Sequence, residues 1–151
     1  MIGWEVGMVR KILIVDDERE VALSLIQHLE QVGYLVEFAG SGEEALSLLE
    51  TTRPDMLICD LRMPEIDGYQ IMAATAAYLN LPDLPIILAD EKWTLESTYH
   101  KAGVRIADCY ISKPYVVREI ALYVRRIFQS IDEDRASTQT SQQCTTPQPP
   151  P

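Results

Sequence analysis

The chain has 151 residues, of which 47% are hydrophobic and 24% charged, a composition typical of one globular domain. Its formal net charge of -10 argues against a nucleic-acid-binding module, because such a module needs a basic face. No apolar run is long enough to cross a bilayer, no export signal is visible, and 3 cysteines do not make a disulfide framework. We therefore expect a cytoplasmic protein without membrane contact.

The two ends of the chain differ in composition from the rest. Residues 1–8 are interpreted as a short N-terminal extension, and residues 9–131 as a single folded domain. Residues 132–151 are rich in Ser, Thr, Gln and Pro and contain no large apolar side chain. Because such a segment buries too little surface to offset its ordering entropy, we expect a disordered tail with no output domain.

Short β-rich runs alternate with amphipathic stretches through the folded part. The first run, Lys11 to Val15, is apolar over most of its length, which is typical of a strand covered on both faces of a parallel sheet. Polar residues, Gly or Pro bound each run. The other four predicted strands are Leu35 to Ala39, Met56 to Cys59, Ile86 to Ala89 and Cys109 to Ser112.

The segments between the runs have helical periodicity. A fourth helix, short and weakly apolar, is predicted around residues 95–102. The stripe predicted for the first helix consists of Val21, Leu25, Leu29 and Val32. The stripe predicted for the last helix consists of Val117, Ile120, Ala121, Val124, Phe128 and Ile131.

Two helix starts carry the pattern of a capping box, a short polar residue followed three positions later by Glu or Gln. Ser41 with Glu44 is predicted to open the second helix, and Asp67 with Gln70 the third. The strict alternation of strands and helices predicts an α/β protein with a doubly wound parallel sheet and helices on both faces.

Acidic residues and one lysine follow the predicted strands. Asp16 and Asp17 follow the first strand, Asp60 the third and Lys113 the fifth. Because the carboxyl ends of parallel strands share one edge of the sheet, these side chains converge if the first and third strands are neighbours. Carboxylates about 4 Å apart repel by roughly 4 kcal/mol at an effective dielectric of 20, so they raise their pKa values or recruit a cation.

An acidic site made only of oxygen ligands suits Mg²⁺. A metal and a lysine on either side of Asp60 are what an attacking carboxylate needs to accept a phosphoryl group. Each residue also has a plainer interpretation: Asp16 or Asp17 alone could cap a helix, and Lys113 with Pro114 could simply end a strand. Their joint placement favours a site.

Three motifs resemble those of the response regulator receiver domain, of the CheY-like type. They are ILIVDDE (Ile12 to Glu18), DLRMPEIDG (Asp60 to Gly68) and YISKP (Tyr110 to Pro114), in the family's order. The resemblance covers about residues 9–131. It implies a flavodoxin-like fold whose five strands lie in the order 2-1-3-4-5.

The resemblance also implies roles for single residues. Asp60 matches the aspartate that accepts the phosphoryl group. Asp17 matches the direct Mg²⁺ ligand, Asp16 the acidic neighbour that holds the metal through water, and the backbone carbonyl of Arg62 the third protein ligand. Lys113 matches the lysine that pairs with the acceptor and then with the phosphoryl group.

Three further positions match the family. The peptide bond before Pro114 is typically cis in receivers. Gly68 helps to shape the loop that leads into the third helix. Tyr110 stands on the fifth strand, where the family keeps an aromatic switch residue.

One position departs from the family pattern. Receivers place a Thr or Ser at the end of the fourth strand, and its hydroxyl bonds to the phosphoryl group. Here that residue is Asp90, or Glu91 when counted back from Lys113. An ionised Asp90 only accepts hydrogen bonds and repels a phosphoryl group of about -1.5 to -2 charge. The acceptor and metal site are therefore expected to be intact, and the switch altered.

The resemblance implies a single-domain response regulator of a two-component phosphorelay. A histidine kinase or phosphotransfer protein would supply the phosphoryl group to Asp60 with Mg²⁺ as cofactor, and the phosphoprotein would signal by contact with a downstream protein. We expect no enzyme activity beyond slow self-dephosphorylation. In the family, the face made by helix 4, strand 5 and helix 5 binds partners or pairs two receivers, so a homodimer through this face is one expectation. The alternative, favoured by Asp90, is a degenerate receiver that acts as a phosphorylation-independent interaction module.

Overall fold

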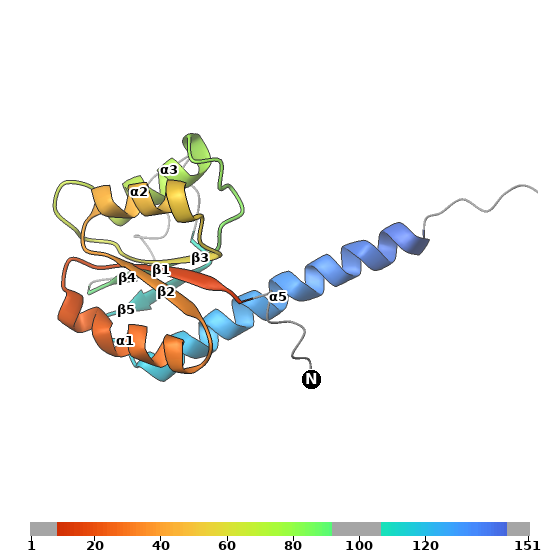
Figure 1. Ribbon diagram of the computed structural model, residues 1–151, viewed down its shortest axis with the longest axis horizontal. Coiled ribbons are helices and arrows are strands. Elements are labelled where there is room, and N and C mark those ends of the chain that lie inside the picture. The colour runs from red at the N-terminus through yellow and green to blue at the C-terminus, as the bar shows by residue number, and fades with distance from the viewer. Residues whose placement is uncertain (1–8, 92–106, 145–151) are drawn as a thin grey trace, which may run out of the picture.

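One parallel sheet organises the chain (Figure 1), of which the computed structural model describes residues 9–91 and 107–144. Its strands lie in the order β2-β1-β3-β4-β5, as predicted. Two of them, β3 and β4, end one residue later than predicted, at an aspartate in each case. The strands are β1 (Lys11–Val15), β2 (Leu35–Ala39), β3 (Met56–Asp60), β4 (Ile86–Asp90) and β5 (Cys109–Ser112).

The register of the sheet brings the carboxyl ends of the three central strands to one edge. Val15 of β1 pairs with Cys59 of β3, and Asp60 of β3 pairs with Ala89 of β4. Every residue of β3 and β4 is buried, as is all of β1 after Lys11. Burial on both faces explains why these strands are apolar without alternation.

Helices cover both faces of the sheet, as predicted, and each face has its own apolar core. On one face lie α1 (Arg19–Gln31) and α5 (Val117–Cys144), and on the other α2 (Gly42–Thr52) and α3 (Gly68–Ala77) (Figure 1). The helix predicted at residues 95–102 lies outside the described residues. Within the described part, no helix is long and apolar enough to span a membrane.

The buried stripe of α1 differs from the predicted one. Ala22, Leu25 and Leu29 are buried, whereas Val21 and Val32 are 42% and 55% exposed. Each residue turns about 100° around a helix, so Val21 faces well away from its neighbour Ala22. The prediction favoured the larger side chain of Val21 and therefore began the stripe one residue before Ala22, the residue that is buried. In α5 the predicted stripe is confirmed, with Ile120, Val124 and Phe128 buried and the other members packed against them.

The two predicted capping boxes form to different extents. At α3, the Gln70 backbone N–H donates to the Asp67 carboxylate at 2.9 Å. In return, the Asp67 backbone N–H donates to the Gln70 side-chain oxygen, also at 2.9 Å. At α2, Ser41 Oγ accepts from the N–H of Glu44 at 3.2 Å. The Glu44 carboxylate, however, accepts from Gly40 at 3.0 Å instead of from Ser41. The second box therefore reaches one residue further back than predicted.

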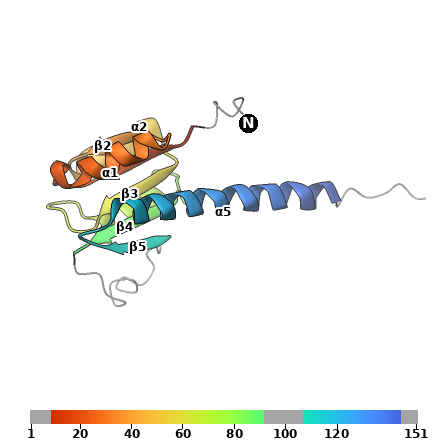
Figure 2. The same cartoon turned by 90° about the horizontal axis from the view of Figure 1, so that it is seen from below.

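The last helix extends beyond the predicted end of the domain. It continues to Cys144 and so overlaps residues 132–144 of the expected tail (Figure 2). The disorder of the tail stays a prediction. Adding residues to an existing helix costs far less than starting one, and the sequence contains neither Gly nor Pro between Val117 and Pro147. Arg10 also pairs with Asp132 and stacks on the Phe128 ring, 4.5 Å from its centroid.

Candidate functional site

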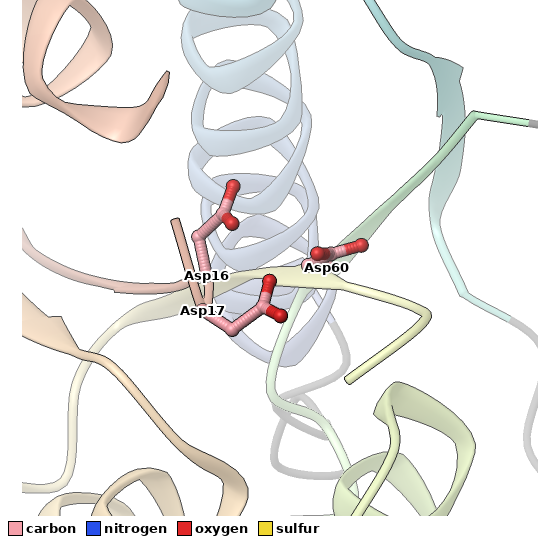
Figure 3. A group of neighbouring side chains, drawn as sticks. All are labelled: Asp16, Asp17 and Asp60. Carbon is pink, nitrogen blue, oxygen red and sulfur yellow. The ribbon is translucent and has the colours of Figure 1, made fainter. Parts of the chain in front are cut away.

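Three aspartates meet at the carboxyl edge of the sheet. Asp16 directly follows β1, and its N–H donates to Ala39 of β2 at 3.1 Å. Asp60 is the last residue of β3. The ligand oxygens of Asp16, Asp17 and Asp60 all lie within 4.8 Å of one another (Figure 3). The predicted convergence is confirmed.

The three carboxylates differ in their exposure to solvent. Asp16 and Asp60 are buried, while Asp17 is exposed. The ligand atoms that the three aspartates offer are all oxygens, and the exposed Asp17 leaves its side of the cluster accessible to water. A hard dication that keeps part of its water shell matches this donor set.

Lys113 carries the positive charge of the site. Its Nζ lies 2.8 Å from Asp16 Oδ2 and 3.4 Å from Asp60 Oδ2. Burial lowers the pKa of Lys113, but the hydrogen bond to Asp16 and the charge of Asp60 outweigh it, so that the net shift is upward. The predicted approach of Lys113 to Asp60 is confirmed, although the shorter contact is to Asp16.

Asp60 is more basic than an ordinary carboxylate. Burial raises its pKa to about 6, against the opposing effect of the Lys113 charge. The Asp16 charge raises it further, while a hydrogen bond from the Arg62 N–H to Asp60 Oδ1, at 3.3 Å, lowers it. Asp60 is therefore half-protonated near pH 6 and mainly ionised at pH 7.5.

The aspartates before α1 do not act as its side-chain caps. The N-cap residue is Glu18, and it makes no side-chain cap hydrogen bond. Asp16 Oδ1 accepts from the Glu18 N–H at 2.9 Å, which fixes the turn that leads into the helix. The other carboxylate oxygen of Asp16 faces Lys113. The plainer interpretation of Asp16 and Asp17 as caps is therefore wrong.

Gly68 lies directly beneath the end of β3. Its N–H donates to the Leu61 carbonyl at 2.9 Å. A Cβ atom at this position would lie 3.0 Å from both the Asp60 carbonyl oxygen and Leu61 Cα. Since these are backbone atoms, a side chain here would displace the strand end that carries Asp60. The predicted role of Gly68 in shaping the loop agrees with this close approach.

Asp90 stands at the end of β4, paired with Ser112. This register identifies Asp90, and not the exposed Glu91, as the strand-end residue. Asp90 is 2% exposed, and its Oδ1 accepts from Arg62 Nε at 2.8 Å. Its Oδ2 has no hydrogen-bond partner among the described residues.

The side chain of Arg62 was missed by the sequence analysis, which considered only its carbonyl. The available signal was a single cation two residues past Asp60, facing an acidic residue at the end of the adjacent strand. The position of the Arg62 carbonyl as a metal ligand stays a prediction.

The remaining predicted residues lie on β5 and just after it. The peptide bond between Lys113 and Pro114 is cis, as predicted. The Tyr110 hydroxyl accepts from the Ala107 N–H at 3.3 Å, and its ring packs against the core under α2 and α3. Its role as a switch residue stays a prediction. The helix 4 part of the expected dimer face lies outside the described residues.

A cleft of about 490 Å³ opens beside this edge of the sheet, between α1 and the start of α5. Val21, Pro114 and Val117 supply apolar walls, and Lys113 reaches it from the acidic site.

Comparison with known proteins points to one family. The response regulator receiver domain model matches residues 12–125. The alkaline phosphatase synthesis transcriptional regulatory protein PhoP of Bacillus subtilis is 35% identical over 81% of this chain and 50% of its own length. The chain thus spans about half the length of the curated relatives it matches.

Solved structures agree in fold. A putative response regulator from Chloroflexus aurantiacus has a TM-score of 0.70 and 35% identity, over 79% of this chain and 97% of that chain. The chemotaxis protein CheY4 of Vibrio cholerae has a TM-score of 0.72 and 25% identity, over 78% of this chain and 98% of that chain.

Proposed function

Because the chain belongs to the response regulator receiver domain family, we propose that it accepts a phosphoryl group from a phosphohistidine onto Asp60. One observation carries this proposal: three carboxylates whose oxygens lie within 4.8 Å of one another face the Lys113 ammonium at the carboxyl edge of the sheet. Carboxylates this close together repel one another, so the cluster is unfavourable unless cations balance its negative charge.

In the proposed step, an Asp60 carboxylate oxygen bonds to phosphorus while the bond from phosphorus to the imidazole nitrogen breaks. The electron pair of that bond stays on the nitrogen, and Asp60 becomes an acyl phosphate. A pKa of about 6 leaves Asp60 mostly ionised at pH 7.5 and more nucleophilic than an ordinary carboxylate. Lys113 stays charged and stabilises the negative oxygens of the transferring group.

The metal proposed for this site is Mg²⁺, held by the carboxylates of Asp16, Asp17 and Asp60 and by the carbonyl of Arg62. The close spacing of the carboxylates and their all-oxygen chemistry fit such an ion. When bound, it supplies positive charge next to the phosphoryl oxygens. Asp16 already uses one oxygen for Glu18 and the other for Lys113, which fits a ligand that acts through water.

The proposed donors are a histidine kinase or a histidine-containing phosphotransfer protein. The cleft beside the site has apolar walls from Val21 and Val117 and lies next to Lys113. A donor helix seated there would bring an imidazole to Asp60. The signal would then pass to a downstream protein by contact, with slow loss of the phosphoryl group as the only catalysis.

We also propose a cytoplasmic location. Cys59 is a buried free thiol, and Cys109 is a half-buried one. Burial raises the pKa of both thiols and so keeps them in the unreactive protonated form. Free thiols in strands fit a reducing compartment.

Labelling with acetyl phosphate in the presence of Mg²⁺ tests the proposal. The wild-type protein should become labelled, and Asp60→Asn should not. Asp83→Asn changes an exposed aspartate away from the site and should be labelled like the wild type. Undiminished labelling of Asp60→Asn would contradict the assignment of the acceptor.

The second candidate is a phosphorylation-independent interaction module. The burial of Asp90 favours it, because an acidic residue stands where the family's hydroxyl would bond to the phosphoryl group. Addition of Mg²⁺ and then beryllofluoride separates the two candidates. A structural response that depends on Asp60 supports the receiver, whereas no response to either addition supports the module.

A further inference from the structure

An ion pair links the ends of the two strands next to the acceptor. The guanidinium of Arg62 donates through Nε to Asp90 Oδ1 at 2.8 Å. Arg62 follows β3 by two residues, and Asp90 is the last residue of β4. The bond therefore ties the loop after Asp60 to the strand end where a switch hydroxyl would stand.

The two partners differ in freedom. The Asp90 side chain is 2% exposed, whereas that of Arg62 is 63% exposed. Burial fixes the carboxylate in place, while the guanidinium can rotate through solvent. If the pair breaks, Arg62 is the partner that moves first.

The pair is also incomplete. Asp90 uses one oxygen, and its Oδ2 has no partner in the described part of the chain. An arginine can offer two parallel N–H groups to a carboxylate or phosphate, which makes a much stronger contact than a single bond. The single hydrogen bond to Asp90 therefore leaves other N–H donors of the Arg62 guanidinium available for a second acceptor.

The backbone places Arg62 against the acceptor. Its N–H donates to Asp60 Oδ1 at 3.3 Å. The Leu61 N–H donates to the Ala89 carbonyl at 2.8 Å, so the loop after Asp60 runs directly beside the end of β4. A phosphoryl group on Asp60 would therefore form close to both members of the pair.

We propose that phosphorylation of Asp60 transfers the Arg62 guanidinium from Asp90 to the phosphoryl group. This inference rests on the proposed function and specifies how the phosphorylated site is read out. A phosphoryl group carries about -1.5 to -2 charge and three acceptor oxygens, so it competes well with one carboxylate oxygen.

The transfer leaves Asp90 without its partner. A buried carboxylate with two unsatisfied oxygens next to a dianion is strongly unfavourable. The end of β4 must then shift until Asp90 reaches water or a new donor. The β4 end would therefore move away from the phosphoryl group, because Asp90 loses its partner and is repelled. A switch hydroxyl, by contrast, moves toward the phosphoryl group.

Two tyrosines lie on the side of the sheet that a shift of the β4 end would affect. Tyr69, in the first turn of α3, and Tyr110, on β5, both pack against the core on the α2 and α3 face of the sheet. Leu88 pairs with Tyr110 two residues before Asp90 pairs with Ser112. A shift of the β4 end would therefore change the packing of both rings, and so the surface that they help to form.

The Arg62 Nε–H resonance reports the transfer directly. In the full chain with Mg²⁺, addition of beryllofluoride should shift this resonance, which is assigned by its loss in Arg62→Lys. The shift should be absent in Asp60→Asn. Arg53 serves as an internal control, since its guanidinium bonds to the carbonyls of Leu79 and Asn80 away from the site.

A double-mutant cycle on beryllofluoride affinity gives a second test. If the guanidinium transfers, Arg62→Gln costs more affinity in the Asp90→Asn background than in the wild type, by about tenfold, because no bond to Asp90 has to be broken there. If the guanidinium stays on Asp90, Arg62→Gln exposes the Asp90 charge to the anion. The loss is then larger in the wild-type background, which overturns the proposal.

The outcomes separate the two proposals. If beryllofluoride produces no response that depends on Asp60, the proposed function fails and the transfer fails with it. If that response occurs but the Arg62 Nε–H resonance stays in place, only the transfer is overturned. The shift of the resonance is measured in the wild-type chain, and Arg62→Lys serves only to assign it.

Discussion

Lys113 lies closer to Asp16 than to Asp60, with Nζ distances of 2.8 and 3.4 Å to the two carboxylates. The lysine thus balances two buried acids at once. A phosphoryl group on Asp60, or a cation between the aspartates, changes that balance. We therefore expect the charge pairing of the site to reorganise when either one binds.

Replacing Lys113 should make Asp60 more basic and a poorer acceptor. Because the Lys113 charge lowers the pKa of Asp60, Lys113→Met should raise that pKa above about 6. Loss of charge stabilisation should slow labelling by about a hundredfold. Carbon-13 NMR titration of the Asp60 carboxyl measures the first effect, and the initial rate of labelling measures the second.

Lys11→Met is the matched control, since Lys11 pairs with Glu37 at the other end of the sheet. It should change neither the pKa of Asp60 nor the labelling rate. A Lys113→Met protein that is labelled at the wild-type rate would contradict the role given to this ammonium.

The unliganded protein should lose stability as the pH rises through about 6. Asp60 has a pKa of about 6 when folded, against an ordinary carboxyl pKa of 3.8, so the folded state binds more protons than the unfolded state in this window. The free energy of unfolding should fall by up to about 3 kcal/mol between pH 4 and pH 7.5 from this group. Urea unfolding in the presence of EDTA measures it.

Asp60→Asn should remove this part of the pH dependence. The variant should also be more stable than the wild type at pH 7.5, because it no longer buries a charge next to Asp16. Equal pH profiles for the two proteins would show that Asp60 titrates as an ordinary carboxylate.

Mg²⁺ should stabilise the protein at pH 7.5. A ligand that binds only the folded state adds about 2.7 kcal/mol at a concentration one hundred times its Kd. Asp17→Asn should abolish most of this gain without harming the fold, since Asp17 is exposed. Thermal unfolding with and without Mg²⁺ measures the effect, with Asp83→Asn as the control. A gain in Tm that persists in Asp17→Asn would place the ion elsewhere.

Gly68→Ala should destabilise the protein by about 1–3 kcal/mol, the usual cost of overpacking. The new Cβ would lie 3.0 Å from backbone atoms of Asp60 and Leu61. Gly40→Ala is the control, because a Cβ there meets nothing closer than 3.8 Å. Denaturant unfolding of the two variants makes the comparison. Equal stabilities would mean that the strand end tolerates displacement.

Much of the fold and the acidic site could be predicted from the sequence. Buried parallel strands are apolar on both faces, so they stand out, and the acidic residues after them fall on one edge. The convergence of Asp16, Asp17 and Asp60 follows from that topology alone. The approach of Lys113 follows once β5 is placed in the sheet.

Other features depend on three-dimensional packing that the sequence does not display. The pairing of Arg62 with Asp90 requires the β3 loop to run beside the β4 end, which only the register reveals. The stripe of α1 was misplaced because Ala22 contributes to the core while the larger Val21 does not. The extension of α5 past Ile131 is not visible in the composition of residues 132–144, because composition does not show that a helix continues from the preceding turn.

The most direct test of the acceptor assignment is to locate the phosphoryl group chemically. The wild-type chain is incubated with acetyl phosphate and Mg²⁺, the acyl phosphate is reduced with borohydride to homoserine, and the peptides are mapped by mass spectrometry. We expect the modification at Asp60 and at no other aspartate. An unmodified Asp60, or a modification at Asp16, Asp17 or Asp90 in its place, would contradict the proposed function.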